Sequence, residues 1–317
     1  MALIILQQIL VMALYMLIGL ALYRAGKMTD EGSETLASLL AYVVIPAMLV
    51  NSFLVEFSPE KLAQFGWSFL LGTGTVALSM LVSTVVFRKG GIDWFAAAYS
   101  NAGFMGLPLI KASIGDAGVF FLVGLLIPFN VSQWVYGCKK LKKGAKGEDA
   151  EEAHERVPLA QTVRQLVLNP MVLASAGGFV LFATGLGTNM PQILRTCISG
   201  VASVNAPLAM IVLGVYLAKS NIAELFRTKR LYFVSGVRLM LIPVITTLAL
   251  AFLPVDNSMK MTMVIASAAP VGANVAIYSQ LFGADYVYAC KTVTHSTLLS
   301  IAVMPLMIFF AGLLIPV

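Results

Sequence analysis

Long apolar runs separated by short polar gaps dominate the chain. Each run is close to the roughly 20 residues that a helix needs to cross the hydrocarbon core of a bilayer. Ten runs can be counted, and Gly and polar residues blur the ends of the last two. They cover approximately 3–23, 33–55, 65–87, 94–114, 117–138, 166–186, 192–218, 231–253, 260–283 and 286–315. The pattern predicts an all-α membrane protein with ten transmembrane helices.

Composition limits the class of protein. Hydrophobic residues make up 59% of the chain, charged residues make up 11%, and the mean hydropathy is +0.89. A soluble domain has about 25% charged residues, so a soluble protein is excluded and the lipid bilayer is the expected surrounding. The formal net charge of +6 falls in the short gaps. That placement is typical of membrane topology and gives no reason to expect nucleic acid as a partner.

Positive residues are concentrated in every second gap. The gaps after the first, third, fifth and seventh runs hold Arg24, Lys27, Arg88, Lys89, Lys139, Lys140, Lys142, Lys143, Lys146, Arg156, Arg164, Lys219, Arg227, Lys229 and Arg230. Because Lys- and Arg-rich loops stay cytoplasmic, these gaps are predicted to be cytoplasmic and both termini to lie outside. We expect the membrane to be a bacterial inner or plasma membrane.

The hydrophilic stretch 139–164 divides the ten runs into two sets of five. It begins basic and turns acidic, which is typical of a solvated linker. We therefore divide the chain into a first five-helix repeat, 1–138, this cytoplasmic linker and a second five-helix repeat, 165–317. Pro46 and Pro207 take corresponding positions in the two halves. Because five is odd, the second repeat is predicted to be inverted relative to the first.

The fourth and ninth runs contain residues that interrupt a helix, within 100–111 and 269–274. These residues are Gly103, Gly106 and Pro108 in the fourth run and Pro270 and Gly272 in the ninth. Proline removes a backbone donor and glycine loosens a helix. Unsatisfied backbone survives at membrane depth only when buried in protein or lining a wet cavity. Matching interrupted helices in two repeats therefore predict the binding site of a secondary transporter.

Broken helices place helix ends near the middle of the membrane. A helix N-terminus carries free N–H groups and a partial positive charge, which suits a carboxylate or another small anion. Asn101 and Asn274 would add amide donors and acceptors at the same depth. Alternatively, these two amides only cap the backbone that the breaks leave free.

Two basic residues have two interpretations each. Lys111 follows the first break and either attracts an anion or extends its long side chain to the outer interface. Arg238 lies well inside the eighth run, where a charge is a functional hypothesis by default, but its stem would also let it reach the interface. Asn130, Gln133 and Asn205 are further polar candidates, because polar residues in spans often bond neighbouring helices.

No Asp or Glu lies in the middle of a run, which weakens a proton-driven mechanism. His295, in the tenth run, is either a proton relay or a packed residue. Sodium could still bind to neutral oxygens, and the candidates for that role are Ser100, Asn101, Ser267 and Asn274. No cofactor is expected. The sequence contains no GxSxG, HExxH or phosphate-loop motif, so we expect no enzyme.

The stretch from Asn101 to Gly115 resembles the fourth helix of the auxin efflux carrier family. The matching positions are Asn101, Met105, Gly106, Pro108, Leu109, Lys111 and Gly115. Leu168-Asn169-Pro170, which opens the sixth run, resembles that family too, as does Pro191 followed by Ala206-Pro207-Leu208 and Gly214 in the seventh run. Asn130 looks like a fifth-helix Gln that contacts substrate in plant carriers. The sodium–bile-acid symporters look like distant relatives.

The resemblance implies ten helices in two inverted repeats. Spans 1, 2, 6 and 7 would form a scaffold that dimerises through spans 2 and 7, and spans 3–5 and 8–10 a mobile transport domain. Spans 4 and 9 would cross at Pro108 and Pro270, and an elevator-like movement would carry the site across the membrane. The implied substrate-binding residues are Asn101, Gly103, Met105, Gly106, Pro108, Asn130, Pro270, Gly272 and Asn274.

The family also indicates a class of substrate. Plant members carry auxin and have Asp and Lys in the third helix, whereas the third run here offers Thr73, Thr75 and Ser79. Short members of this kind resemble bacterial carriers of malonate, malate and similar carboxylates. We therefore expect a carrier of a small organic anion. A channel or a ligand-binding membrane sensor of the same fold is the alternative.

Overall fold

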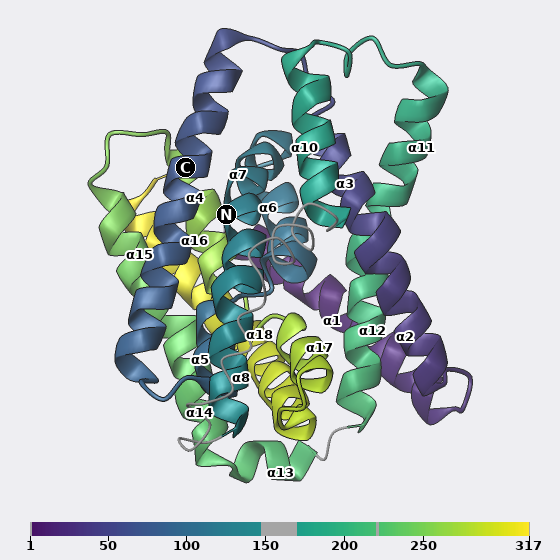
Figure 1. Ribbon diagram of the computed structural model, residues 1–317, viewed down its shortest axis with the longest axis vertical. Coiled ribbons are helices and arrows are strands. Elements are labelled where there is room, and N and C mark those ends of the chain that lie inside the picture. Colours follow the sequence, from purple (N-terminus) through teal and green to yellow (C-terminus); the bar gives the residue numbers. More distant parts are fainter. Residues whose placement is uncertain (1, 147–169, 220–221, 317) are drawn as a thin grey trace.

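The computed structural model describes residues 2–146, 170–219 and 222–316. Within these ranges the regular structure is helical, apart from one isolated antiparallel β-bridge between Ser100 and Val271 (Figure 1). The all-α prediction is confirmed for this part of the chain. The helices up to the end of the first range are α1 (Ala2–Arg24), α2 (Asp30–Leu39), η1 (Leu40–Val44), α3 (Ile45–Ser52), α4 (Pro59–Val86), α5 (Gly91–Ala98), η2 (Ala102–Gly106), α6 (Leu107–Ser113), α7 (Asp116–Ser132), η3 (Gln133–Gly137) and α8 (Cys138–Lys146).

The helices of the two later ranges continue in the same style. They are α10 (Pro170–Ala183), α11 (Gln192–Ser203), α12 (Asn205–Lys219), α13 (Ile222–Arg227), α14 (Lys229–Gly236), η4 (Val237–Leu241), α15 (Ile242–Ala251), α16 (Asn257–Ala268), α17 (Asn274–Leu281) and α18 (Tyr286–Leu314). Elements η1 to η4 are single π-helical turns.

Seven helical runs in the described ranges are long and apolar enough to cross a membrane. They are Leu6–Arg24, Asp30–Ser52, Pro59–Val86, Asp116–Lys142, Gln192–Lys219, Lys229–Ala251 and Tyr286–Leu314. Helix α10 is a shorter apolar helix, and the start of its predicted run lies outside the described residues. The predicted runs 94–114 and 260–283 are each divided into helical pieces. A total of ten spans therefore stays a prediction.

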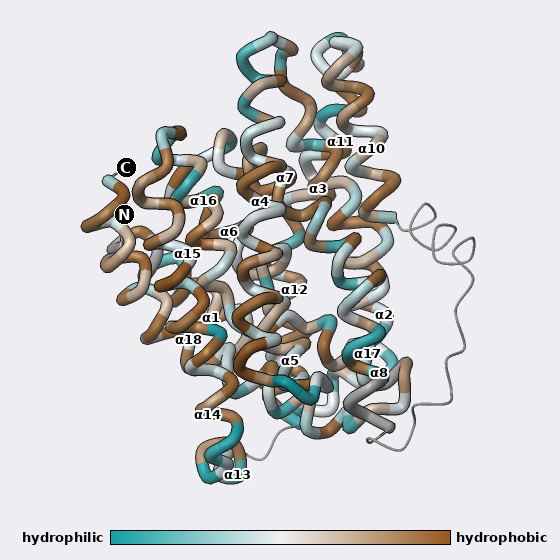
Figure 2. The backbone as a smooth tube through the Cα atoms, turned by 60° about the vertical axis from the view of Figure 1, so that its left-hand side comes forward, coloured by the Kyte–Doolittle hydropathy of each residue, from teal (hydrophilic) through white to brown (hydrophobic). Residues whose placement is uncertain are grey.

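Hydrophilic stretches lie at the two ends of the molecule. Figure 2 shows α13 at one end and the start of α4 at the other in teal, with mostly hydrophobic segments between them. The predicted linker 139–164 differs from expectation at its start, because α8 continues the preceding helix through its lysines as far as Lys146. Lysine is a good helix former. Most of the remaining linker, 147–164, lies outside the described residues.

Glycine allows two helices to approach closely at α1 and α12. A Cβ atom at Gly19 would collide with the backbone of Ile211, and a Cβ atom at Gly214 would collide with the backbone of Met16. Small residues at such contacts are typical of membrane helices, where lipid is as apolar as leucine and close packing favours association. Helices α4 and α7 meet in the same way at Gly72 and Gly124.

For description we divide the helices into two groups. The first contains α1–α3 and α10–α12, and the second contains α4–α8 and α14–α18; α1 and α12 of the first group also contact α6, η2 and α18 of the second. In Figure 1 helices α2, α3, α11 and α12 lie on the right, and α4, α14, α15 and α16 lie on the left. Phe53 after α3 contacts Phe65 of α4 and Phe179 of α10, with ring centroids 5.4 and 6.1 Å apart. This aromatic contact joins the groups near one end.

Three of the π-helical turns in the described ranges lie directly before a proline. Pro46, Pro108 and Pro243 each stand at the first or second position of the α-helix that follows the turn. A proline lacks an N–H and its ring clashes with the carbonyl four residues earlier. The wider π turn accommodates both effects. The chain therefore remains helical through Pro108, and the prediction that the fourth run breaks at this proline is wrong.

Candidate functional site

The first interrupted stretch leaves its helix at Tyr99. Helix α5 ends at Ala98, and Tyr99 has extended backbone angles of φ −116° and ψ 113°. Asn101, at φ −84° and ψ 45°, precedes the next helical piece, η2. Residues 99–101 therefore form a short non-helical segment in the middle of an apolar run.

The second interrupted stretch breaks at its proline, as predicted. Helix α16 ends at Ala268, and Ala269 is extended at φ −60° and ψ 146°. A residue that precedes a proline favours this conformation because the proline ring clashes with a helical one. Helix α17 begins only at Asn274, so 269–273 is the counterpart of the first break.

The two non-helical segments pair with each other. The N–H of Asn101 donates to the carbonyl of Pro270 at 2.7 Å, and the N–H of Gly272 donates to the carbonyl of Tyr99 at 3.1 Å. These bonds flank the single β-bridge. Backbone groups that one break leaves free are thus satisfied by the other break, as the interior of a membrane protein requires.

Side chains and a glycine support this pairing. The hydroxyl of Ser100 donates to the carbonyl of Ala266 at 2.8 Å, and the hydroxyl of Ser296 in α18 accepts from the N–H of Val271 at 3.1 Å. A Cβ atom at Gly272 would lie 3.0 Å from the carbonyl oxygen of Ser100. A larger residue there would push the two segments apart.

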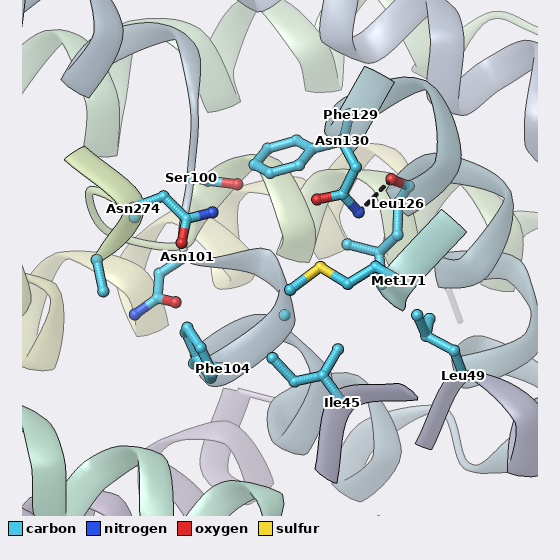
Figure 3. Close-up of a pocket in the computed structure, with 13 residues that line it drawn as sticks. Ile45, Leu49, Ser100, Asn101, Phe104, Leu126, Phe129, Asn130, Met171 and Asn274 are labelled. Atoms are coloured by element: carbon cyan, nitrogen blue, oxygen red, sulfur yellow. Dashed lines mark hydrogen bonds between the residues drawn. The ribbon is translucent and has the colours of Figure 1, made fainter. Parts of the chain in front are cut away.

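A cavity of about 40 Å³ lies beside the paired segments. Its lining comes from both helix groups and contains Ile45, Leu49, Ser100, Asn101, Gly103, Phe104, Leu126, Phe129, Asn130, Met171, Gly272, Ala273 and Asn274 (Figure 3). A water needs about 10–15 Å³ by this measure, so the space suits a few waters or one end of a small ligand. No charged residue lines it in the described part of the chain.

Three asparagines supply polar groups to the lining. Figure 3 shows Asn101 and Asn274 on one side of the space and Asn130 on the opposite side. The Nδ2 of Asn130 donates to the carbonyl of Leu126 at 2.8 Å, and the Nδ2 of Asn274 donates to Oε1 of Gln133 at 2.9 Å. Asn130 and Asn274 therefore have their amide nitrogens engaged by the protein.

Two buried amide nitrogens at the site have no hydrogen-bond partner within the described residues. They are Nδ2 of Asn101, a lining residue that is 2% exposed, and Nε2 of Gln133, which bonds Asn274 through its oxygen, is 1% exposed and does not line the cavity. Nearly all buried polar groups in proteins are paired with protein or water. The unused donor of Asn101 therefore points to a ligand or water that accepts hydrogen bonds.

Helix N-termini also border the cavity. Gly103 and Phe104 in η2 and Ala273 and Asn274 at the start of α17 are lining residues. The first N–H groups of a helix have no partner inside the helix and carry a partial positive charge. Both second half-helices therefore contribute positive potential to a space whose side chains are neutral.

Several predicted site residues lie behind the cavity rather than on it. Met105, Gly106, Pro108 and Pro270 are all buried but do not line it. The sulfur of Met105 accepts from the hydroxyl of Ser300 at 3.9 Å. These residues pack the two interrupted stretches together instead of facing the cavity.

Asn205 and Ser267 also take structural positions. The Nδ2 of Asn205 in α12 donates to the carbonyl of Gly103 at 3.2 Å, which links the first helix group to η2. The hydroxyl of Ser267 donates to the carbonyl of Val264 at 2.8 Å, inside its own helix. Neither side chain lines the cavity.

The two basic residues with open roles are placed differently. Lys111 does not line the cavity and pairs with Asp116, with 51% and 82% of the two side chains exposed. Arg238 is 1% exposed and donates to backbone carbonyls beside the breaks. It does not extend to an interface. His295 is buried too, with Nδ1 2.9 Å from the hydroxyl of Ser235.

The apolar residues that line the cavity were not predicted from the sequence. Ile45, Leu49 and Met171 come from the first helix group, and Phe104 and Phe129 come from the second. Nothing in the residue pattern separates these side chains from others that face lipid or core. Only Phe104 and Phe129 had a signal, because each lies near a predicted polar site residue.

Comparison with known proteins decides the family. A family model described as membrane transport protein matches residues 4–308. The chain belongs to this family. The resemblance to auxin efflux carriers is thereby confirmed, and the protein is an integral membrane transporter. Membership of a transporter family also agrees with the prediction that it is no enzyme.

Two relatives of this transporter align over most of its length. A Rhizobium meliloti (strain 1021) protein named as a candidate malonate transporter is 24% identical over 292 residues, which is 88% of each chain. A Methanothermobacter thermautotrophicus protein named as an uncharacterized transporter is 25% identical over 315 residues, which covers 95% of this chain and 96% of the relative.

Proposed function

We propose that the chain is a secondary transporter of a small organic anion, with a malonate- or malate-like carboxylate as the first candidate and an auxin-like acid as the second. The observation that carries this proposal is the cavity at the two paired breaks. It combines the unused amide donor of Asn101 with two helix N-termini and, among the described residues, no acidic lining residue. A carboxylate accepts hydrogen bonds and favours the positive end of a helix.

The malonate relative agrees with this class of substrate. A dicarboxylate would place one carboxylate against Asn101, whose amide nitrogen has no hydrogen-bond partner among the described residues. The apolar side chains of Phe104, Phe129 and Met171 would contact the carbon chain. The space of about 40 Å³ holds only one end of such an anion, so a whole dicarboxylate, and still more a bulkier auxin-like acid, requires a wider state.

We further propose that the two groups of helices are the scaffold and the transport domain of an elevator. The first group corresponds to spans 1, 2, 6 and 7, and the second to spans 3–5 and 8–10. Span 1 packs on span 7 through α1 and α12, and span 6 packs on span 2 through α10 and α3. An inverted repeat relates span 1 to span 6 and span 2 to span 7, so it converts the first of these helix pairs into the second. Because the cavity lies between the groups, sliding one group along the other would move it across the membrane.

Topology and assembly complete the proposal. Both chain ends lie close together in Figures 1 and 2, which agrees with an even number of spans. The Lys- and Arg-rich gaps of the sequence favour an outside position for both termini. The linker 139–164 would then be cytoplasmic. A homodimer through spans 2 and 7 would bury exposed apolar side chains such as Tyr42 and Val43, which are 69% and 46% exposed.

The experiment is a substrate panel on the purified protein. Malonate, malate and indole-3-acetate are compared for their effect on Tm and for flux of the labelled anion into proteoliposomes. A ligand of the folded state raises Tm, and we expect malonate or malate to do so and to be carried. If none of the three anions raises Tm or is carried, the proposed substrate class is wrong. Planar-bilayer currents far above carrier turnover would indicate a channel instead.

A further inference from the structure

Arg238 is a buried charge that the substrate cavity does not use. It lies in η4 of the second helix group, is 1% exposed, and does not line the cavity. Among the described residues no Asp or Glu forms an ion pair with it. The nearby acid, Asp93, is paired with Arg230 at 2.6 Å. The positive charge of Arg238 must therefore be balanced in another way.

The partners of Arg238 are backbone carbonyls at the ends of both broken helices. One guanidinium nitrogen, Nη1, donates to the carbonyl of Ala97 at 2.7 Å and to that of Ala98 at 3.4 Å. The other, Nη2, donates to the carbonyl of Ser267. Helix α5 ends at Ala98 and α16 ends at Ala268. A single side chain thus caps both first half-helices.

The ends that Arg238 caps are negative. The last carbonyls of a helix have no partner within it, and the end carries roughly half a negative charge. Two such ends meet at the paired breaks, so together they present about one negative charge at membrane depth. The guanidinium stays protonated and supplies one positive charge in a planar fork. The charges balance without a carboxylate.

Carbonyls of interrupted half-helices are also the ligands with which transporters coordinate a coupling Na⁺. We propose that Arg238 is a built-in counter-cation of the paired breaks. Its fixed positive charge occupies the helix-end carbonyls that a coupling Na⁺ would otherwise bind. Transport therefore proceeds without Na⁺. Arg238 is a positioning residue here, because it touches the breaks and not the anion. The Na⁺ site considered for Ser267 in the sequence is taken up by this contact.

The test separates charge from hydrogen bonding with two variants. Arg238→Lys keeps the charge and Arg238→Gln keeps a donor without the charge. Tm is measured in detergent in NaCl and in KCl at equal ionic strength. We expect the wild type and Arg238→Lys to show no Na⁺ dependence. Arg238→Gln should have a lower Tm in KCl and recover roughly 3 °C or more in NaCl, because a bound cation stabilises the folded state.

The matched control is Arg195, which also donates to backbone carbonyls. Its partners are the carbonyls of Leu54 at 3.0 Å and Thr188 at 3.3 Å, and neither residue belongs to the paired breaks. Arg195→Gln should show no Na⁺ dependence. If Arg238→Lys and Arg238→Gln respond alike to Na⁺, or if Arg238→Gln has the wild-type Tm in both salts, the proposal is overturned.

A second measurement tests the proposal even if Arg238→Gln folds poorly. Guanidinium chloride at low millimolar concentration should raise the Tm of Arg238→Ala by filling the vacated position, and leave the wild type unchanged. Equal responses of the two proteins would contradict the proposal. The counter-cation proposal rests on the proposed transport function only where it concerns flux. We expect the flux of the anion to be equal in NaCl and in KCl. The unfolding measurements need no substrate, so a failed anion screen and a failed counter-cation are distinguishable.

Discussion

At the scale of single residues, two kinds of amide lie at the cavity or directly behind its lining. Asn274 and Gln133 bond each other at 2.9 Å, so their roles include holding α17 against η3. The side chain of Asn101 has an unused nitrogen and its backbone carries the contact to Pro270. Replacement of each residue should therefore have different consequences for stability.

Asn274→Ala is expected to lower the free energy of unfolding by about 1–3 kcal/mol, because Oε1 of Gln133 is left buried without a donor. Asn101→Ala should leave stability close to that of the wild type, because its side-chain nitrogen has no protein partner to lose. Thermal unfolding of both variants without substrate checks this. An Asn101→Ala variant that is as unstable as Asn274→Ala would show that the amide is structural.

Lys111 matches the family motif but lies outside the cavity. Its ion pair with Asp116 is largely exposed, and pairs of this kind contribute about 0–1 kcal/mol. We expect Lys111→Gln and the matched Asp116→Asn to keep transport within about twofold and to leave Tm unchanged. A loss of flux in Lys111→Gln alone, with normal Tm, would mean that the lysine contacts the anion in another state.

At the scale of elements, the two prolines of the interrupted stretches have different roles. Pro270 keeps Ala269 extended and places its carbonyl opposite Asn101. Pro108 stands at the start of a continuous helix after a π turn. The family motif treats them as equivalent, and the structure does not.

Pro270→Ala should therefore impair transport much more than Pro108→Ala. An alanine at position 270 allows Ala269 to become helical and weakens the paired segments. An alanine at position 108 adds a donor within an existing helix, and we expect flux within about threefold of the wild type, since alanine favours a helix. Flux in proteoliposomes and Tm are compared. The reverse order of effects would place the functional break at Pro108.

Elements differ in how far they could be predicted. The hydrophobic pattern located the helices because each apolar run is long and bounded by polar residues. The ninth-run break followed from Pro270, since a proline fixes the residue before it. The fourth-run break at 99–101 has no proline, and depends on pairing such as that of Ser100 with Val271, 171 positions away in the sequence. The role of Arg238 could not be predicted either. Its partners are backbone carbonyls that are free only because helices α5 and α16 end beside it.

At the scale of the whole molecule, the cavity lies at the boundary between the two helix groups. Asn205 of the first group contacts the carbonyl of Gly103 of the second at 3.2 Å. Both groups contribute residues to the lining of this cavity of about 40 Å³. The proposed elevator therefore predicts that the groups move relative to each other during transport.

A cross-link between the groups tests that movement. Gly103→Cys and Asn205→Cys are combined in a protein whose native Cys138, Cys197 and Cys290 are replaced by Ser. We expect oxidation to abolish flux and a reductant to restore it, while each single cysteine variant is unaffected by oxidant. Oxidised protein that is fully cross-linked yet transports at the reduced rate would contradict an elevator.

The central claim is that the paired breaks and their amides hold a transported organic anion. Counterflow of labelled malonate in proteoliposomes tests it most directly, with wild type, Asn101→Ala and the control Asn189→Ala, whose exposed loop amide donates to the carbonyl of Gly185. A hydrogen bond to a carboxylate contributes about 1.5–3 kcal/mol, so Asn101→Ala should raise KM roughly 10- to 100-fold. Asn189→Ala should match the wild type. Wild-type counterflow in Asn101→Ala would contradict the account.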